Sequence, residues 1–532
     1  MPRSTTPSFI TELPLIVTPE VEQILLVRLE AGRQLYNAVL GEAKIRVGLI
    51  KQSKLFQYAK TLPKMTAGKP NPERKEAFQQ AWKLYDFSDY ALQKFSNDIR
   101  KSCWIGEHID ADSAQKLGTR AFKAARNLLL KRAKRVRFKG RNQMDSLEGK
   151  SKRSPMKWKD GAFVWAGVTL QALIKRNDPV ILHGLNSPVK YVRLVRRKIG
   201  GKNRFYVQLV NQGKPFQKDK NQLGAGLVGL DIGPSTLAIV GDNEAVLTPF
   251  CSALKEATQK VARLQRQMSR QQRANNPDCF EPDWCDLPKS GQKHGKRKRG
   301  KAIKGKRQTQ RSNTYQKVRI RKAEADRKLA AHRKSLQNQL VNDIRRMGDV
   351  FKLEKLSYRA FQKLFGKSVG KRAPGMFVAQ LKQKAETAGG FVDEFPTRDT
   401  KLSQRCICGL INKKTLSQRE HRCECGVYAQ RDLFSGFLAR HVDESHCYQA
   451  EAALAEFHSL DAVLLTAWKQ AEQRYNQSSI GNLREVKRTA ASAPERVVSE
   501  SISHSLEMAG QSSKTLDVVG KDLFRSREPG RG

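Results

Sequence analysis

The stretch GLVGLDIGPSTLAIVGD, residues 226–242, constrains the fold more than any other part of the sequence. It contains two short apolar runs, joined by a Gly-Pro-Ser sequence that is typical of a turn. We therefore expect two neighbouring strands, over 228–232 and 237–240. Asp231 lies inside the first run, although an ionised group that leaves water without a partner costs several kcal/mol. Its side chain must face either solvent or a cation.

Two further acids stand in comparable positions. Glu354 ends the apolar part of GDVFKLEKLS (348–357), which indicates a strand with an acid at its end, followed by a loop. Asp432 lies in AQRDLFSGFLAR (429–440), where apolar residues follow at helical spacing and place the acid in the first turn of a helix. Taken singly, each acid also has an ordinary interpretation, as a strand-end carboxylate, a surface residue or a helix cap.

Acids on two strands and one helix can converge on a pair of divalent cations. Two ions held about 4 Å apart hydrolyse phosphodiesters, because one activates water and the other stabilises the leaving oxygen. Carboxylates are the protein ligands that Mg²⁺ prefers. Asp231, Glu354 and Asp432 are therefore candidate catalytic ligands of two Mg²⁺ ions.

Four cysteines between the second and third acids form two close pairs, and a glycine that lets the backbone turn around a metal follows each pair. They are Cys406, Cys408, Cys423 and Cys425. Four thiolates in two such turns suit tetrahedral Zn²⁺, although the usual pair has two intervening residues and each pair here has one. Four reduced surface cysteines are the alternative interpretation, and His421 is a possible additional ligand.

The charge of the chain indicates a nucleic-acid partner. Its 100 Lys and Arg residues outnumber 51 Asp and Glu, which gives a formal charge of +49. Such an excess repels itself unless a polyanion neutralises it. An acidic membrane surface is the alternative, but the sequence shows neither an apolar run of about 18 residues nor a signal peptide. We expect a soluble intracellular protein whose nine cysteines are reduced thiols or metal ligands.

Residues 1–220 have the pattern of helices followed by strands. Thr18 and the proline after it indicate the start of one helix, and a second is predicted over 113–138. A basic run without an acid lies at the end of the second, which favours phosphate contact over an ordinary solvated face. The residues of this run are Lys131, Arg132, Lys134, Arg135, Arg137, Lys139 and Arg141. From about residue 155, the segments GAFVWAGVTL and PVILHGL and a hairpin around 200–203 have strand periodicity, which predicts a small β-barrel or sheet.

Residues 251–346 are predicted as a long helical pair around an acid-free segment rich in Lys, Arg, Gly and Gln. Such a segment can be a targeting signal or a disordered tail, but between folded pieces it more often orders against nucleic acid. Its candidate nucleic-acid contacts are Arg297, Lys298, Arg299, Arg307 and Arg311. The mostly polar residues 446–532 are expected to form a variable, flexible tail.

Together these motifs resemble, in their order, the split RuvC-like nuclease of TnpB proteins. Bacterial insertion sequences encode TnpB, and TnpB is the relative from which type V CRISPR effectors descend. The resemblance rests on GLDIG, a later strand ending in Glu before LS, the four cysteines, and RD directly after them. It covers residues 1 to about 442 in layout, and the specific motifs lie between 226 and 440.

The resemblance implies a multidomain α+β fold. Its N-terminal helical and small β-barrel domains would form a wedge and recognition region. A split RNase H-like (RuvC) α/β nuclease domain would follow, carrying the basic helical insertion and an inserted zinc ribbon. The implied boundaries are 1–220 for the N-terminal region, 221–400 for the nuclease core, 401–428 for the ribbon and 429–445 for the last RuvC motif.

Residue by residue, Asp231, Glu354 and Asp432 match the family's metal-binding acids, and the four cysteines match its zinc ligands. Besides the shortened cysteine pairs, the sequence departs from the family at two points. Gln430 stands where the family often has another acid, and FSG at 434–436 stands where it often has NAA. Both departures concern the packing of the local helix and the geometry of the metal site.

The implied function is that of an RNA-guided DNA endonuclease in the bacterial cytoplasm. It would bind a transposon-derived guide RNA, recognise a short motif beside a double-stranded DNA target, and cut with Mg²⁺. Base pairing would supply most of the specificity. Three alternatives stay open: a small type V CRISPR effector with the same core, a guide-RNA-dependent DNA-binding protein without cleavage, and a DNA transposase with its own acid triad.

Overall fold

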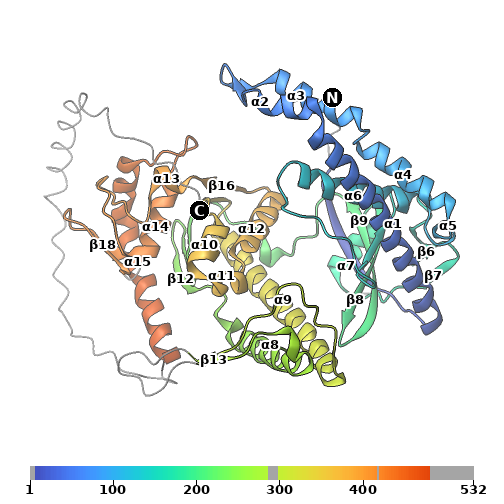
Figure 1. The fold of residues 1–532 in the computed structure, drawn as a ribbon. Helices are drawn as coiled ribbons and strands as arrows, with labels where there is room; N and C mark the ends of the chain where they lie inside the picture. The colour runs from blue at the N-terminus through green and yellow to red at the C-terminus, as the bar shows by residue number, and fades with distance from the viewer. Residues whose placement is uncertain (1–5, 176, 286–296, 416–417, 480–532) are drawn as a thin grey trace. The chain divides into compact units, whose positions relative to one another are not determined.

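The computed structural model describes residues 6–175, 177–285, 297–415 and 418–479 (Figure 1). The chain divides into two compact units, Met1–Gln217 and Lys218–Gly532. Among the described residues, none of the helices has the length and apolar character needed to span a bilayer.

In the first unit, helices pack around the long helix α1 (Pro19–Gln52), which begins as the sequence predicts. The Thr18 side chain accepts a hydrogen bond from the amide of Val21 at 3.5 Å, and the proline occupies the first turn. Leu29 and Leu35 of this helix lie in the unit's apolar core. The other helices are α2 (Lys54–Thr61), α3 (Pro72–Leu84), α4 (Asp89–Ser102), α5 (Ile105–His108), α6 (Ala111–Leu129) and α7 (Pro179–Asn186).

The strands of this unit form a sheet of order β1-β9-β8-β4, a sheet of order β5-β6-β7 and the short pair β2-β3. The predicted hairpin is present, because Gly200 and Gly201 adopt positive φ between β8 and β9. An isolated bridge between Leu15 and Ala172 links the first two sheets. The strand bounds are β1 (Ser8–Pro14), β2 (Met65–Thr66), β3 (Lys69–Pro70), β4 (Ser146–Glu148), β5 (Lys157–Lys159), β6 (Ala162–Trp165), β7 (Val168–Gln171), β8 (Val189–Ile199) and β9 (Lys202–Gln212).

Two expectations for this unit are wrong. The segment PVILHGL is the helix α7 and not a strand, because Asp178 accepts a hydrogen bond from the amide of Val180 and a proline begins the first turn. The second predicted helix, α6, ends at Leu129 and not at 138. The basic run that follows is a loop, and the Asn37 side chain of α1 exchanges two 2.8 Å hydrogen bonds with the backbone of Lys139.

The second unit is built on a mixed five-stranded sheet of order β12-β11-β10-β15-β16. Pairing is antiparallel from β12 to β10 and parallel from β10 to β16. The two strands predicted from residues 226–242 are β10 and β11, and the strand predicted to end at Glu354 is β15. The bounds are β10 (Leu227–Ile232), β11 (Thr236–Val240), β12 (Ala245–Pro249), β15 (Val350–Glu354) and β16 (Phe391–Phe395).

Helices cover both faces of this sheet. On one face, Val341 of α9 (Asn313–Met347) and Phe377 of α12 (Pro374–Ala388) join the apolar side chains of β10 and β15. On the other, Phe437 of α14 (Arg431–Arg440) and Phe457 of α15 (Ala450–Ser479) pack on β11. Figure 1 shows α14 and α15 together in orange to red-orange, α9 in yellow and α12 in golden orange.

Of the remaining described elements of this unit, only α8 (Lys255–Asn275) is long, and it pairs with α9. The helical pair predicted for 251–346 is present as α8 and α9. The other elements are the 3-10 turns η1 (Asp219–Asn221), η2 (Ser252–Leu254) and η3 (Pro277–Cys279), the strands β13 (Trp284–Cys285), β14 (Arg297–Lys298), β17 (Glu420–Arg422) and β18 (Tyr428–Gln430), and the helices α10 (Tyr358–Phe365), α11 (Lys367–Arg372) and α13 (Thr397–Thr400).

The region after residue 446 differs from the expected flexible tail. Residues 450–479 form α15, and its apolar residues Phe457, Leu460 and Leu464 are buried against the sheet and α14. Apolar residues at helical spacing make this helix possible despite the polar composition around them. The rest of the predicted tail, 480–532, lies outside the described residues.

Candidate active site and metal centre

The structure brings together the three acids that the sequence singles out. Asp231 near the end of β10, Glu354 at the end of β15 and Asp432 in the first turn of α14 line one cavity of about 390 Å³. Basic side chains line the same cavity, namely Lys401, Lys414, Arg419 and Arg431. Three carboxylates from distant parts of the sequence therefore share a space with a positively charged lining.

The register of the two central strands explains why these acids meet. Leu230 and Leu353 are partners in the parallel pair β10–β15, and both point into the apolar core. Asp231 and Glu354 each follow one residue later, so both side chains point to the opposite face, where α14 packs. An acid inside an apolar strand is thereby explained, since alternate residues of β10 face different surroundings.

Close packing places Asp432 over this face. Gly229, two residues before Asp231, lies against Gly436 of α14, and a Cβ atom at Gly229 would meet the Gly436 carbonyl oxygen at 2.0 Å. Only a glycine allows the helix to approach the strand this closely. A Cβ atom at Gly436, within the FSG departure, would be less constrained, since it would meet the Val240 side chain at 3.2 Å and the Gly229 carbonyl oxygen at 3.6 Å.

Gln430, the other departure from the family pattern, caps α14. Its side-chain oxygen accepts a hydrogen bond from the amide of Leu433 at 2.7 Å. The residue takes the part of a helix cap in place of the acid that the family often has.

The carboxyls of Asp231 and Glu354 are held in surroundings that favour their neutral forms. Burial raises the pKa of Asp231 well above its ordinary value, and the charges of Asp432 and Glu354 raise it further, against the effect of Arg431. Burial also raises the pKa of Glu354 to about 7, although hydrogen bonds from the Leu402 backbone and from Thr400 act in the opposite direction.

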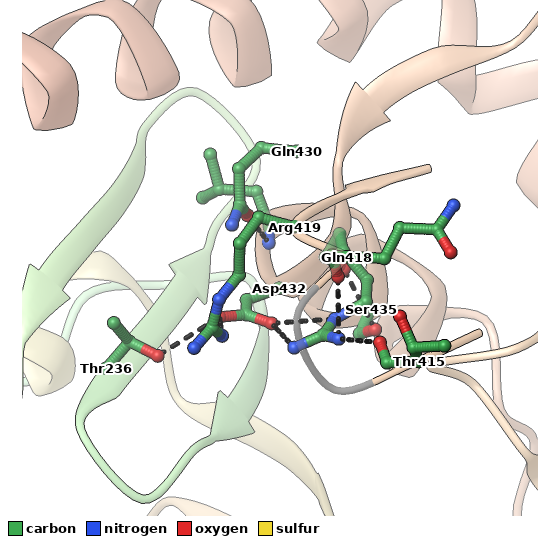
Figure 2. Close-up of polar contacts among 9 residues, drawn as sticks. Thr236, Thr415, Gln418, Arg419, Gln430, Asp432 and Ser435 are labelled. Carbon is green, nitrogen blue, oxygen red and sulfur yellow. Dashed lines mark hydrogen bonds and ion pairs between the residues drawn. The ribbon is translucent and has the colours of Figure 1, made fainter. Parts of the chain in front are cut away.

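Asp432 is held by partners on both carboxylate oxygens (Figure 2). The guanidinium of Arg431 donates to Oδ1 at 2.9 Å, and the hydroxyl of Thr236 donates to Oδ2 at 3.0 Å. Arg419 lies 3.5 Å from Oδ2. Arg431 is itself fixed by a 2.8 Å hydrogen bond to the carbonyl of Gln418. These contacts orient the Asp432 carboxylate toward the cavity that it shares with the other two acids.

The four cysteines form one compact cluster, and their sulfur atoms all lie within 4.8 Å of one another. Cys406 pairs with Cys425 and Cys408 with Cys423, each at 3.6 Å between sulfurs. Hydrogen bonding between Cys406 and Cys408 lowers the pKa of the Cys408 thiol and raises that of Cys406. Within the described parts of the chain, no other group of three or more His, Cys, Asp or Glu side chains is this compact, the three acids of the cavity included.

The two cysteine pairs lie in matching turns. In the first, Gly409 donates its amide to the Cys406 carbonyl, and in the second Gly426 donates to that of Cys423, both at 3.1 Å. Both glycines have positive φ, a conformation that glycine adopts without steric cost and that turns the backbone after each pair. His421, considered as an additional ligand, instead packs against Phe434 at 4.4 Å between ring centroids and contacts Lys414.

The predicted nucleic-acid contacts lie on the surface where the structure describes them. In the loop 131–141 all seven are exposed except Lys139, which is half-buried. Arg299, Arg307 and Arg311 are also exposed. The side chains of Arg297 and Lys298 lie outside the described residues, although their backbone forms β14. These positions stay predictions.

Several residues of the cavity were not found from the sequence. Thr236, Lys401 and Arg419 are isolated polar or basic residues in a strongly basic chain, so no pattern distinguishes them. Arg431 directly precedes Asp432, and its place in the RD pair was the one available signal.

Comparisons with known proteins agree with part of this description. Residues 375–435 match the family model described as the Cas12f1-like TNB domain. This segment extends from α12 into α14 and includes the four cysteines and Asp432. No curated protein matches the chain.

Two solved structures show an overall likeness. The cryo-EM structure of a Cas12f1-sgRNA-target DNA complex is 14% identical, with 81% of this chain and 98% of that chain covered and a TM-score of 0.37. The cryo-EM structure of a CRISPR-Cas12f ternary complex is 11% identical, with 83% and 100% covered and a TM-score of 0.30. At TM-scores this low, neither likeness carries an argument about this chain.

Fold and site define a class: a mixed α/β protein of more than one domain, with three carboxylates at one cavity and a four-thiol cluster compatible with a zinc ribbon. The family model makes the assignment more specific. The segment 375–435 is similar to the Cas12f1-like TNB domain, which agrees, for that segment, with the resemblance to TnpB and type V CRISPR proteins that the sequence motifs indicate.

Proposed function

We propose that the protein is an RNA-guided DNA endonuclease with an RNase H-like (RuvC) core. The observation that carries this proposal is the convergence of Asp231, Glu354 and Asp432 on one cavity. The mixed sheet with helices on both faces is compatible with the core that the family resemblance implies. The match of residues 375–435 to a Cas12f1-like domain supports the same family of activities.

The donor set at this cavity fits Mg²⁺, because it offers hard carboxylate oxygens. Burial and the charges of the other two acids raise the pKa of Asp231, and this like-charge arrangement is one that a divalent cation would relieve. Asp231, Glu354 and Asp432 would hold the ions. Two bound Mg²⁺ ions supply an activated water and stabilise the leaving oxygen of a phosphodiester.

Other residues of the cavity would bind and orient the substrate. Lys401 and Arg419 place positive charge where a phosphodiester enters, and an arginine guanidinium matches phosphate geometry. Thr236 and Arg431 hold the Asp432 carboxylate in position before any ligand arrives.

The four-thiol cluster would hold one structural Zn²⁺. Tetrahedral thiolate sites of this kind contribute directly to folding. Strand β18 of this region ends at Gln430, and α14 begins at the next residue. A folded ribbon would therefore fix the start of the helix that carries Asp432.

The proposed partners are a guide RNA and its double-stranded DNA target. The charge of +49 is suited to two polyanions, and binding should weaken steeply as salt increases because each neutralised phosphate releases counterions. The bacterial cytoplasm stays the predicted location.

Cleavage of matched DNA tests the proposal. Protein purified with its bound RNA, in Mg²⁺, should cut a DNA duplex that matches that RNA. D231N, E354Q and D432N should each lower the cleavage rate by about 100-fold or more, because several kcal/mol of transition-state stabilisation would be lost. Glu244→Gln, which changes an exposed acid between β11 and β12, is the matched control and should cut normally. An inactive wild type or fully active acid variants would contradict the proposal.

A small type V CRISPR effector is the second candidate, and the Cas12f1-like domain favours it. It would share the core and differ in the source of its guide. Sequencing the RNA that co-purifies with the protein distinguishes a CRISPR-derived guide from a transposon-derived one. The same cleavage assay excludes or supports a guided binder without cleavage, and a strand-transfer assay does so for a transposase.

A further inference from the structure

A second charged cavity lies on the helical insertion of the second unit. It has a volume of about 370 Å³ and is lined by Arg270, Arg273, Asp283 and Arg299. It shares no lining residue with the cavity of the three acids. Three guanidinium groups face one carboxylate, which leaves an excess of positive charge in a concave space.

Arg273 is held in place at this cavity. One of its terminal nitrogens donates to the Gly300 carbonyl at 2.7 Å, and another lies 3.8 Å from the Asp283 carboxylate. Its guanidinium also stacks over the ring of Phe280 at 4.4 Å. A guanidinium fixed by three neighbours loses little further freedom when it binds an anion.

Arg270 and Arg299 complete the cavity differently. Both are exposed, and within the part of the chain that the structure describes neither forms an ion pair or a side-chain hydrogen bond. Other exposed arginines are paired with acids, as Arg346 is with Asp343 and Arg197 is with Glu12, whereas these two are not. The guanidinium groups of Arg270 and Arg299 are therefore available to an external anion.

The surface of α8 continues this charge. Lys260, Arg263 and Arg266 precede Arg270 at intervals of three or four residues, so all lie on one helical face, and all are exposed. Successive members are separated by about 5 Å along the axis. The row leads along the helix to the cavity at its C-terminal end.

We propose that this cavity and the row on α8 bind consecutive phosphates of a nucleic-acid strand, outside the site of the three acids. The ligand class is a phosphodiester backbone, from either the guide RNA or the DNA target. An ordinary solvated helix face would not need a concave end in which one arginine is fixed and two lack protein partners. The inference rests on the proposed function only in that the chain binds nucleic acid, because it requires no cleavage.

Salt-dependent binding of the full-length protein tests this site. A labelled 20-nucleotide single-stranded RNA, and DNA of the same sequence, would be titrated at several salt concentrations. Each phosphate contact contributes about 0.7 to the slope of log K against log salt for single strands, so R270Q/R299Q should lower its magnitude by about 1.4 and weaken binding. R270K/R299K, which keeps the charge but not the fork of donors, should recover most of the slope.

The matched control is R197Q/R346Q, which removes the same charge from two acid-paired arginines. Its slope should equal that of the wild type. A loss with RNA on the free protein would assign the site to the guide, and a loss seen only when the protein with its bound RNA takes up DNA would assign it to the target. The inference is overturned if R270Q/R299Q changes neither slope, or no more than the control does. Since cleavage is not measured, a failure here is distinguishable from an absence of nuclease activity.

Discussion

At the scale of single residues, the position of a residue along β10 determines whether its side chain faces the apolar core or α14. Val228, Leu230 and Ile232 enter the apolar core, whereas Gly229 and Asp231 face α14. The glycine brings the helix close, and the acid then lies beside Asp432. The packing of this face and the proposed metal site therefore depend on two residues that are neighbours on the same side of one strand.

The pH dependence of cation binding follows from Glu354. The pKa of Glu354 is raised from 4.5 to about 7 in the folded protein. The protonated carboxyl therefore stabilises the fold of the metal-free protein, fully so below pH 4.5, and this stabilisation is lost as the pH rises through 7. At pH 6 a cation must displace the proton, and at pH 8 it need not. Mg²⁺ should therefore raise the melting temperature more at pH 8 than at pH 6. E354Q, measured in the same way, should reduce the difference, and an equal effect of Mg²⁺ on the wild type at both pH values would contradict this.

Gly229→Ala should destabilise the second unit. The new methyl group would overlap the Gly436 carbonyl oxygen, and overpacking of this kind typically costs about 1–3 kcal/mol in the free energy of unfolding. Gly370→Ala is the control, because a Cβ atom there would meet only the Gln362 side chain, at 3.6 Å. Urea unfolding monitored by circular dichroism measures both. Equal stability of the two variants would show that α14 can move away from β10.

At the scale of elements, α14 connects the parts of the second unit. Arg440 near its end is buried and donates to the carbonyl of Leu227 in β10 at 2.8 Å. It also pairs with Asp242 at 2.7 Å and with Glu456 of α15. The helix that carries the third acid is thus bonded to the sheet at both of its ends, to β10 through Arg440 and to β11 through Asp432, which accepts a hydrogen bond from Thr236.

The thiol cluster should bind zinc through all four of its cysteines. The full-length protein should contain one Zn²⁺ per chain, and C408S should bind much less because three thiolates hold the ion less tightly than four. Cys447→Ser is the control, since Cys447 is an exposed cysteine outside the cluster. Zinc released by denaturation can be counted with a chromogenic chelator. Wild-type protein without zinc, or C408S with a full complement, would contradict the assignment.

Elements with strong local signals were predictable from the sequence. The strands around Asp231 and Glu354 and the start of α1 were found because their apolar periodicity and caps are local. The helix α7 was mistaken for a strand, since eight mostly apolar residues fit either period and only the Asp178 cap decides between them. For α15, the polar surroundings obscured a buried stripe that has its partner in α14 and the sheet.

The same distinction applies to the site. Asp231, Glu354 and Asp432 stand in recognisable motifs, and the cavity contains all three. Arg419 and Thr236 could not be singled out, because their roles come from a fold that brings them to Asp432 across 13 and 196 residues of sequence. Contacts over such separations leave no periodic signal in a single chain.

At the scale of the whole molecule, two units have separate apolar cores. Leu25 lies in the core of the first unit and Phe377 in a core of the second, and both are fully buried. Units with their own cores are expected to unfold as separate cooperative transitions. The formal charge of +49, by contrast, is a property of the whole chain and would attract an anionic partner to either unit.

Calorimetry of two core variants tests this independence. Leu25→Ala should destabilise the first unit by about 2–5 kcal/mol and Phe377→Ala the second by about 3–5 kcal/mol, through the cavities that they create. Each variant should lower one transition and leave the other in place. A single transition that both variants shift equally would show that the units unfold together.

The place of Asp432 in the chain has a consequence for protein synthesis. A ribosome makes β10 first, then β15, and α14 last of the three elements that carry the acids. Until residue 432 has been added, the growing chain contains two of the three carboxylates, and Gly229 has no helix against it. Any messenger broken or terminated before this point encodes a product that lacks the third acid, however well its earlier parts fold.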